Sequence, residues 1–191
     1  ENIKNFQKNF KTIDPLICFA VKANPNKIIL RQMGKLGLGA DVVSVGELIR
    51  ALKAGIKPNK IVFSGVGKTS HELIHAIEKN ILLINAESKS EILEIERIAK
   101  TKKKRVNVGV RLNPNTDAKT LSQISTGKKE NKFGIPEKDL IHIVKYIKNS
   151  KYLNLKCLSV HIGSQILDHA PYEKMLKVVK RIINKTKFKF E

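Results

Sequence analysis

The chain has 191 residues, of which 41% are hydrophobic and 28% charged, as in an ordinary soluble domain with one core. No apolar run approaches the roughly 20 residues of a membrane span. The net charge of +20 suggests nucleic acid, but aromatic residues are only 5%, arginines are few and the lysines are dispersed, so we expect a solvated lysine-rich surface with neither a nucleic-acid nor a membrane partner.

The apolar pattern predicts strands alternating with helices along the chain. The predicted strands cover residues 16–21, 39–43, 61–64, 81–85, 106–112 and 155–161, and a seventh starts at 187–190. The predicted helices cover residues 26–36, 45–54, 70–79, 87–100, 136–148 and 171–185. A long polar loop at 113–133 follows the fifth strand.

This alternation indicates an α/β fold with βαβ units and a parallel sheet. The strands are continuous apolar runs, as burial on both faces requires. A doubly wound sheet and a (β/α)8 barrel both fit, although no G-x-G-x-x-G follows the first strand, which weakens the dinucleotide-binding interpretation. As a barrel, the chain holds about six βα units and the start of a seventh strand, which leaves two strand edges unpaired.

Unusual polar residues gather where the predicted strands end, which is the catalytic end of such barrels. A lysine at a strand end can form a Schiff base with an aldehyde cofactor, and Lys22 follows the first strand directly. Several such residues together suggest one rim around a site. They are Lys22, Asp41, Ser44, Ser64, Asn85 to Glu87, Arg111, Asn113, His161, Ser164 and Gln165.

Two other motifs are assigned no special chemistry. The GVGKT run at 65–69 lacks the upstream glycine of G-x-x-x-x-G-K-[ST], so a nucleotide phosphate loop is rejected. Cys18 and Cys157 lie in apolar runs without metal-ligand spacing, so we expect buried free thiols in a reducing cytoplasm and no metal site.

Six segments, in the same order, resemble the fold-type III pyridoxal-phosphate decarboxylases, the family of ornithine, arginine and diaminopimelate decarboxylases. The segments are FAVKAN at 19–24, GADVVS at 39–44 with GEL at 46–48, FSGVGKT at 63–69, RLNP at 111–114, STG at 125–127 through KFGI at 132–135, and HIGSQ at 161–165. The third and fifth segments favour the diaminopimelate branch of this family.

The resemblance implies a partial TIM (β/α)8 barrel of the alanine-racemase-like type, with pyridoxal 5'-phosphate as the cofactor. It implies decarboxylation of meso-2,6-diaminopimelate to L-lysine in the cytoplasm, by a homodimer in which Lys132 pairs across the interface. Residues 1–191 would be an incomplete cofactor-binding barrel domain. The family's glycine-rich phosphate turn, an acid for the pyridine nitrogen and a C-terminal β-domain would be missing, so we expect the chain alone to be inactive and poorly folded.

The resemblance also assigns roles to five residues. Lys22 would form the Schiff base and carry protons, and His161 would lie flat against the pyridine ring. Ser164 would hydrogen-bond the phosphate, Arg111 would lie near the phenolic oxygen, and Asp41 would lie close to Lys22 and bias its charge. The plainer alternatives are a surface lysine, a core histidine, a helix N-cap, an ordinary ion pair and a structural strand-end aspartate, respectively.

Alternative functions remain at this point. Another basic amino-acid decarboxylase of the same family, acting on ornithine, arginine or carboxynorspermidine, shares the lysine motif. A non-catalytic pyridoxal-phosphate carrier, a remnant of a decayed gene or one half of a split enzyme would also fit. Turnover of each substrate, and the reading frame downstream, distinguish these possibilities.

Overall fold

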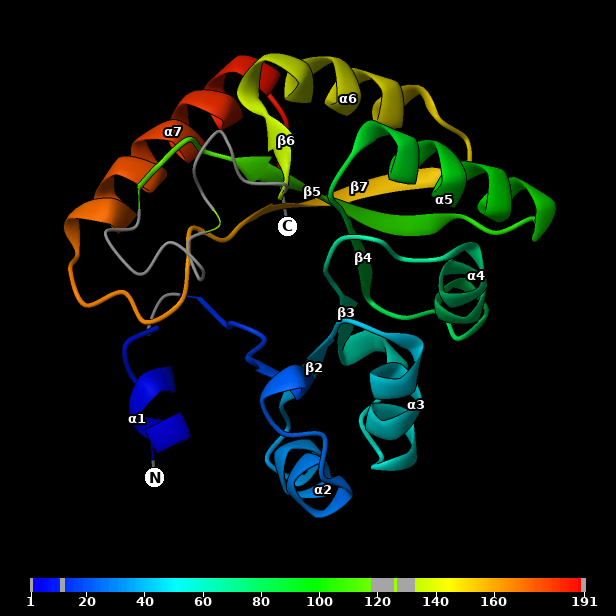
Figure 1. Ribbon diagram of the computed structural model, residues 1–191, viewed down its shortest axis with the longest axis vertical. Coiled ribbons are helices and arrows are strands. Elements are labelled where there is room, and N and C mark those ends of the chain that lie inside the picture. The colour runs from blue at the N-terminus through cyan, green and yellow to red at the C-terminus, as the bar shows by residue number, and fades with distance from the viewer. Residues whose placement is uncertain (1, 11–12, 118–125, 127–132, 190–191) are drawn as a thin grey trace.

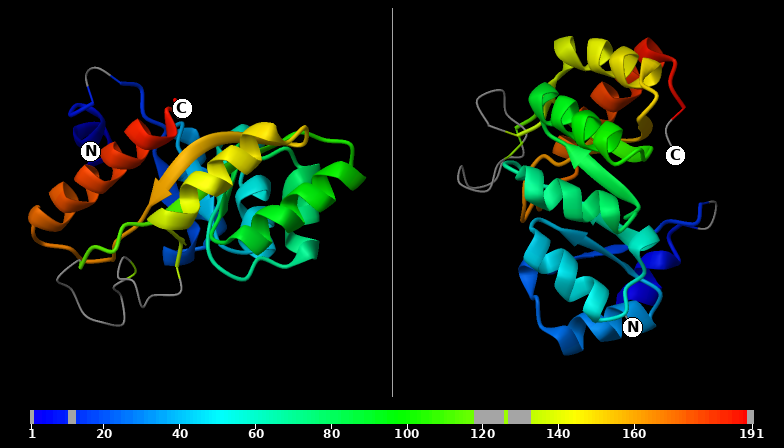
Figure 2. Two further views of the ribbon diagram at one scale, coloured as in Figure 1. Left: turned by 90° about the horizontal axis from the view of Figure 1, so that it is seen from above. Right: turned by 90° about the vertical axis from the view of Figure 1, so that its right-hand side faces the viewer.

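The computed structural model describes residues 2–10, 13–117, 126 and 133–189. It shows a curved parallel sheet with its helices arranged along the outer, convex side (Figure 1). The sheet is open among the described residues, because its outer strands do not pair with each other; Figure 2 gives two further views of it. The parallel α/β sheet that the alternating pattern predicts is therefore confirmed, and so is the partial barrel that the family resemblance implies.

Seven parallel strands form one sheet within the described part of the chain. They are β1 Cys18–Ala20, β2 Gly39–Val42, β3 Ile61–Phe63, β4 Leu83–Ala86, β5 Val106–Asn113, β6 Ile135–Pro136 and β7 Leu153–Val160. Neighbours follow the chain order from β1 to β5, and β7 pairs with β5. Among the described residues, the outer edges of β1 and β7 have no strand partner.

β5 has partners on both of its edges. β7 pairs with it from Val106 to Leu112 along one edge. On the other edge β4 pairs with Val108 to Val110, and the short β6 pairs with the last two residues of β5. The sequence did not predict β6, since two residues are too few to show a strand pattern.

The described residues also form seven α-helices and two short 3-10 turns; all of these except α1 and α7 lie between strands in the chain. The helices are α1 Asn2–Gln7, α2 Lys27–Lys35, α3 Val45–Lys53, α4 Ser70–Glu78, α5 Lys89–Thr101, α6 Glu137–Asn149 and α7 Ala170–Thr186. The 3-10 turns are η1 Val21–Ala23 and η2 Pro58–Lys60. All six predicted helices are present, and α1 is additional.

Four consecutive helices begin with a side-chain cap placed just after a strand or its loop. Asn26, Ser44 and Ser88 each accept a hydrogen bond from a backbone N–H in the first turn of α2, α3 and α5. Thr69 and Glu72 form a reciprocal capping box at the start of α4. These caps fix where each loop ends, so they also fix the polar residues that precede each helix.

Apolar side chains fill the layer between the sheet and the helices. Leu48, Phe63, Leu73, Ile84 and Ile95 are fully or almost fully buried there. Removal of such side chains from water is the main favourable term in folding. Within the described residues, no helix is both long enough and apolar enough to span a membrane.

The predicted seventh strand is wrong for the residues that the structure describes. Lys187 caps α7 in the left-handed conformation, with φ of 46°, and Phe188 and Lys189 form no strand. A strand requires a neighbour for its backbone hydrogen bonds, and none pairs with this segment. The remaining residue of that prediction, Phe190, lies outside the described residues.

Candidate active site

A cleft of about 650 Å³ opens at the carboxyl ends of the strands. Its walls bring together the five residues to which the family resemblance assigns roles: Lys22, Asp41, Arg111, His161 and Ser164. Three other polar residues of the predicted rim do not line it: Ser44, Asn113 and Gln165. Twelve further residues line it: Cys18, Val43, Val62, Ser64, Gly65, Val66, Asn85, Glu87, Thr126, Phe133, Ser159 and Val160. The catalytic and binding roles of the five residues stay predictions.

Lys22 reaches the cleft because the chain turns as soon as β1 ends. β1 stops at Ala20, and the turn η1 begins at Val21, whose carbonyl accepts a hydrogen bond from the Asn24 N–H at 3.0 Å. Val21 is fully buried, which anchors the turn, whereas Lys22 is exposed along the cleft wall. A primary amine is thereby presented at the barrel mouth.

Asp41 begins a chain of hydrogen bonds across three strand ends. The Ser64 hydroxyl donates to Asp41 Oδ1 at 2.6 Å, and Asn85 Nδ2 donates to Ser64 Oγ at 3.2 Å. Burial raises the pKa of Asp41, while the Ser64 hydrogen bond and then Lys22 act in the opposite direction. The predicted proximity of Asp41 and Lys22 is thus supported by their shared cleft and their electrostatic attraction.

Cys18 lies beside this carboxylate and lines the same cleft. Burial, followed by the negative charge of Asp41, raises the pKa of the Cys18 thiol to about 11. Burial also raises the pKa of Cys157. Both thiols are free, and these environments make them poor nucleophiles at neutral pH.

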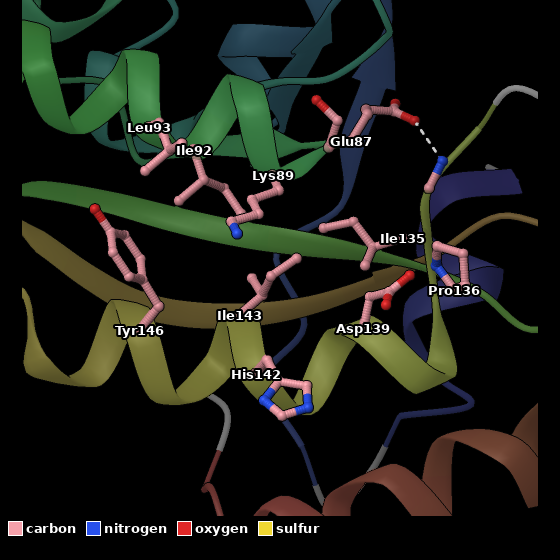
Figure 3. A pocket seen from close by; sticks show the side chains of 12 residues that line it. Glu87, Lys89, Ile92, Leu93, Ile135, Pro136, Asp139, His142, Ile143 and Tyr146 are labelled. Atoms are coloured by element: carbon pink, nitrogen blue, oxygen red, sulfur yellow. Dashed lines mark hydrogen bonds between the residues drawn. The ribbon is translucent and has the colours of Figure 1, made fainter.

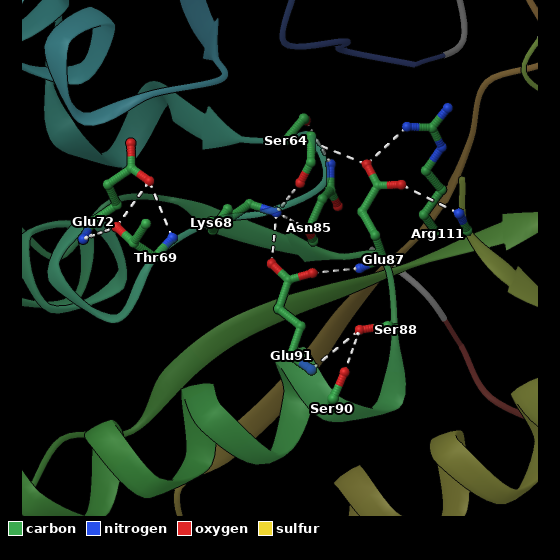
Figure 4. A network of polar contacts seen from close by, with 12 residues as sticks. Ser64, Lys68, Thr69, Glu72, Asn85, Glu87, Ser88, Ser90, Glu91 and Arg111 are labelled. Carbon is green, nitrogen blue, oxygen red and sulfur yellow. Dashed lines mark hydrogen bonds and ion pairs between the residues drawn. The ribbon is translucent and has the colours of Figure 1, made fainter. Parts of the chain in front are cut away.

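Arg111 is held by the carboxylate of Glu87, a residue that the sequence pattern predicted to lie in a helix. Its Nη1 donates to Glu87 Oε1 at 2.8 Å, and both residues are buried (Figure 4). α5 begins at Lys89 with Ser88 as its N-cap, so Glu87 stays in the loop, where it can face the cleft. The predicted helix over 87–100 was therefore two residues too long at its start.

Glu87 also binds the backbone of two neighbouring segments. The Gly65 N–H donates to Glu87 Oε1, and the Gly134 N–H donates to Glu87 Oε2, both at 3.2 Å. The Phe133 ring lies under the Arg111 guanidinium, with its centroid 4.9 Å from Cζ. Glu87 thus ties together the loops after β3, β4 and β5.

His161 follows β7 and is fixed by Thr126. The Thr126 hydroxyl donates to the His161 carbonyl at 2.9 Å and lies 2.7 Å from its Nδ1. Because a hydroxyl has one hydrogen, Nδ1 then carries the ring proton and donates to Thr126, which leaves Nε2 as the acceptor in the neutral ring. Burial, and then the cations Arg111 and Lys22, lower the pKa of His161 and favour this neutral form.

Ser164 lines the cleft just beyond His161. The alternative that it caps a helix is wrong, because α7 begins at Ala170 with His169 as its N-cap. Lys132, which the resemblance places at a dimer interface, lies outside the described residues, as do Ser125 and Gly127 of the STG motif.

The ammonium group of Lys68, in the GVGKT run, donates its hydrogen bonds to oxygens of the protein itself. It donates to the Gly65 carbonyl at 2.6 Å, the Asn85 carbonyl at 2.8 Å and Glu91 Oε1 at 2.7 Å. The lysine of a phosphate loop must instead reach the phosphates. This arrangement agrees with the rejection of a nucleotide site.

Among the described residues, no cluster of three or more His, Cys, Asp or Glu could hold a metal ion.

A second cavity of about 550 Å³ lies between α5 and α6 (Figure 3). Ile92, Leu93 and Ile143 line it, with Tyr146 and His142 on the α6 side. It contains none of the five predicted residues, whereas Glu87 lines both cavities. The five residues to which the resemblance assigns roles therefore lie in the cleft at the strand ends and not in this second cavity.

Comparisons with known proteins agree on one family. Residues 1–190 match the family model described as pyridoxal-dependent decarboxylase, pyridoxal binding domain. The chain is 48% identical over 183 residues to diaminopimelate decarboxylase of Helicobacter pylori strain J99, a match that covers 94% of this chain and 45% of the relative. It is 43% identical over 187 residues to the Campylobacter jejuni protein of the same name, covering 98% and 46% respectively.

The crystal structure of diaminopimelate decarboxylase from Helicobacter pylori complexed with L-lysine superimposes with a TM-score of 0.93 and 46% sequence identity. The alignment covers 96% of this chain and 46% of that one. The chain thus spans about half the length of the curated relatives it matches.

Proposed function

Because the chain belongs to the pyridoxal-dependent decarboxylase family, we propose that its protein decarboxylates meso-2,6-diaminopimelate to L-lysine and carbon dioxide. The names of the relatives and the lysine complex of the Helicobacter pylori enzyme support this choice of substrate. The observation that carries the proposal is the meeting of Lys22 and His161, which are far apart in sequence, in one cleft.

The residues of the cleft fit pyridoxal phosphate. The volume of about 650 Å³ lies within the range of small-molecule sites. A primary amine, an imidazole, a guanidinium and a hydroxyl converge there from three segments, and they match an aldehyde, an aromatic ring and anionic oxygens. Lys22 would hold the aldehyde carbon, Arg111 the phenolic oxygen and Ser164 the phosphate.

When bound, pyridoxal phosphate supplies the electron sink that receives the pair left by the departing carbon dioxide. Lys22 provides the amine that holds the cofactor and carries a proton back to the substrate carbon. The neutral ring of His161, held by Thr126, gives a flat surface without a positive charge. The loops that Glu87 links by hydrogen bonds form part of the cleft wall.

Reduction with borohydride tests the predicted role of Lys22. The protein expressed from its full gene is mixed with pyridoxal phosphate, reduced and mapped by peptide mass. We expect the label on Lys22 and at least a tenfold loss of labelling in Lys22→Ala, since a Schiff base needs the amine. Lys27→Ala removes an exposed lysine of α2 and should label normally. A dominant label on any other lysine contradicts the assignment.

Substrate choice is tested by turnover. The protein expressed from its full gene is incubated with meso-diaminopimelate, ornithine, arginine or carboxynorspermidine, and the amine product is measured. We expect lysine from the first substrate only. Preference for another substrate makes the protein a different decarboxylase, and binding of the cofactor without any turnover makes it a carrier.

We further propose that residues 1–191 are one cofactor-binding domain of a cytoplasmic homodimeric enzyme. The expected inactivity of these residues alone is checked in the same lysine-release assay. The dimer is checked by light scattering of the full-length protein. A monomer with full activity would contradict the shared-site arrangement that the family resemblance implies.

A further inference from the structure

We propose that Ser64 is a positioning residue of this site: its hydroxyl, oriented by Asn85, fixes Asp41 as a carboxylate beside Lys22. The inference rests on the proposed function for its catalytic meaning, because it assigns to Lys22 a neighbouring negative charge. The hydrogen bonds themselves join Asp41, Ser64 and Asn85 in the chain without cofactor.

The three side chains come from the ends of three consecutive strands. Asp41 lies on β2, Ser64 follows β3 and Asn85 lies on β4, and all three line the cleft. Each strand pairs in parallel with the next, so the ends of the strands are adjacent. The chain of hydrogen bonds from Asn85 through Ser64 to Asp41 is thus a direct product of the sheet (Figure 4 shows its Ser64 and Asn85 members).

The direction of these hydrogen bonds follows from counting hydrogens. A carboxylate only accepts, so Ser64 must give its single hydroxyl hydrogen to Asp41. The group facing Ser64 from Asn85 must then be a donor, which is its Nδ2. The amide oxygen of Asn85 points to Gly109, where an added Cβ would lie only 2.2 Å from it. Because Gly109 has no side chain, it leaves room for the Asn85 amide to lie with its Nδ2 toward Ser64, as the chain of hydrogen bonds requires.

Asp41 needs this donor because burial disfavours its charge. The charged or titratable groups that face it are Lys22 on η1, Lys68 after β3, Arg111 on β5 and the Cys18 thiol on β1. Lys68 and Arg111 are already paired with Glu91 and Glu87. The Ser64 hydrogen bond is the largest of the effects that favour the Asp41 anion, followed by Lys22.

The chemical consequence concerns the amine of Lys22. A fixed carboxylate beside it attracts its positive charge and can accept a hydrogen from it. Without the Ser64 hydroxyl, Asp41 would hold its proton to a higher pH, and it would then be a neutral donor rather than an acceptor. The pH below which the cofactor no longer binds would then rise together with the pKa of Asp41.

The first test is the titration of Asp41 in the cofactor-free protein expressed from its full gene, followed by carbon-13 NMR of its carboxyl group. We expect Ser64→Ala to raise the midpoint by about one pH unit, the size of a hydrogen bond to a charged acceptor. Ser64→Thr keeps a hydroxyl and should restore the midpoint. Asn85→Ala frees the hydroxyl to rotate and should give a smaller shift of the same sign.

Ser159→Ala is the matched control, because Ser159 is a β7 serine of the same cleft, while the hydroxyl bound to Asp41 is that of Ser64. It should leave the Asp41 midpoint unchanged. Thermal melting of each variant shows that the comparison is made on folded protein. The proposal is overturned if Ser64→Ala leaves the midpoint in place, or if Ser159→Ala moves it equally.

The second test measures pyridoxal phosphate affinity against pH by absorbance. We expect the acid limb of binding to move upward in Ser64→Ala by the same amount as the Asp41 midpoint, with affinity at pH 8 within about twofold of the original. An acid limb that stays in place would overturn the catalytic part of the proposal. Labelling of a lysine other than Lys22 would instead refute the proposed function and leave the titration result to decide the role of Ser64.

Discussion

Glu87 shows how one carboxylate can set the position of several groups. Its two oxygens accept from Arg111, Gly65 and Gly134, and all three of these partners are donors. A glutamine would offer only one acceptor oxygen and would turn an amide N–H toward at least one of these donors. The negative charge also balances Arg111 at a buried position.

We therefore predict that Glu87→Gln destabilises the chain strongly. The loss should be about 3–5 kcal/mol, since Arg111 is left as a buried charge without its partner. Glu94→Gln is the matched control, because Glu94 pairs with Arg97 on the exposed side of α5. Its effect should be small, as for most surface pairs. Urea unfolding measures the free energy of unfolding of both variants. Equal losses would show that the buried ion pair contributes no more to stability than the exposed one.

At the scale of the elements, the strand ends are positioned by close backbone contacts and helix caps. Gly39 begins β2, and an added Cβ there would lie 2.2 Å from the Lys60 carbonyl oxygen and 2.7 Å from Cys18 Sγ. Gly46 lies in α3, where the nearest atom to an added Cβ is Ser44 Oγ at 3.8 Å. An added Cβ thus meets a rigid obstacle at Gly39 and makes only an ordinary van der Waals contact at Gly46.

Gly39→Ala should cost about 1–3 kcal/mol of stability, because a backbone oxygen cannot move aside without shifting a strand. Gly46→Ala should stabilise the chain by about 0.5–1 kcal/mol, since alanine favours the helix and restricts the unfolded chain. Thermal melting of the two variants compares them directly. A loss of stability in Gly46→Ala, or none in Gly39→Ala, would contradict this account.

For the whole molecule, an excess of 20 positive charges surrounds the half-open sheet. Charges of one sign repel more strongly in the compact chain than in the unfolded one. The helices cover the convex face, and the outer edges of β1 and β7 are unpaired among the described strands. Repulsion and open edges therefore both limit the stability of this chain.

Added salt should stabilise the chain. Raising sodium chloride from 20 to 200 mM shortens the screening length about threefold, and we expect the melting temperature to rise by about 2–4 °C for each kcal/mol of repulsion removed. Calorimetry at two salt concentrations measures the shift. A fall in melting temperature would mean that attractive ion pairs outweigh the net repulsion.

The sequence predicted the barrel units and the rim because strand ends in parallel sheets share one edge. It did not identify Glu87 as the partner of Arg111, since the helix was predicted to begin at Glu87, two residues before α5 begins. Thr126 lies in the polar loop, where no periodicity shows that it contacts His161. Contacts across about 24 to 35 positions depend on the folded sheet and leave no local signal.

β5 has a neighbour on each side along most of its length, so its amide hydrogens reach solvent only after β4 or β7 has separated from it. β1 is bonded on one side only within the described sheet. β7 likewise has only one paired edge, so opening fluctuations can begin at β1 or at β7, and β3 and β4 lie furthest from both outer strands. Lys22 and His161, which follow the outer strands β1 and β7, are therefore displaced early, whereas Ser64 and Asn85, at the ends of β3 and β4, are among the last cleft residues to move.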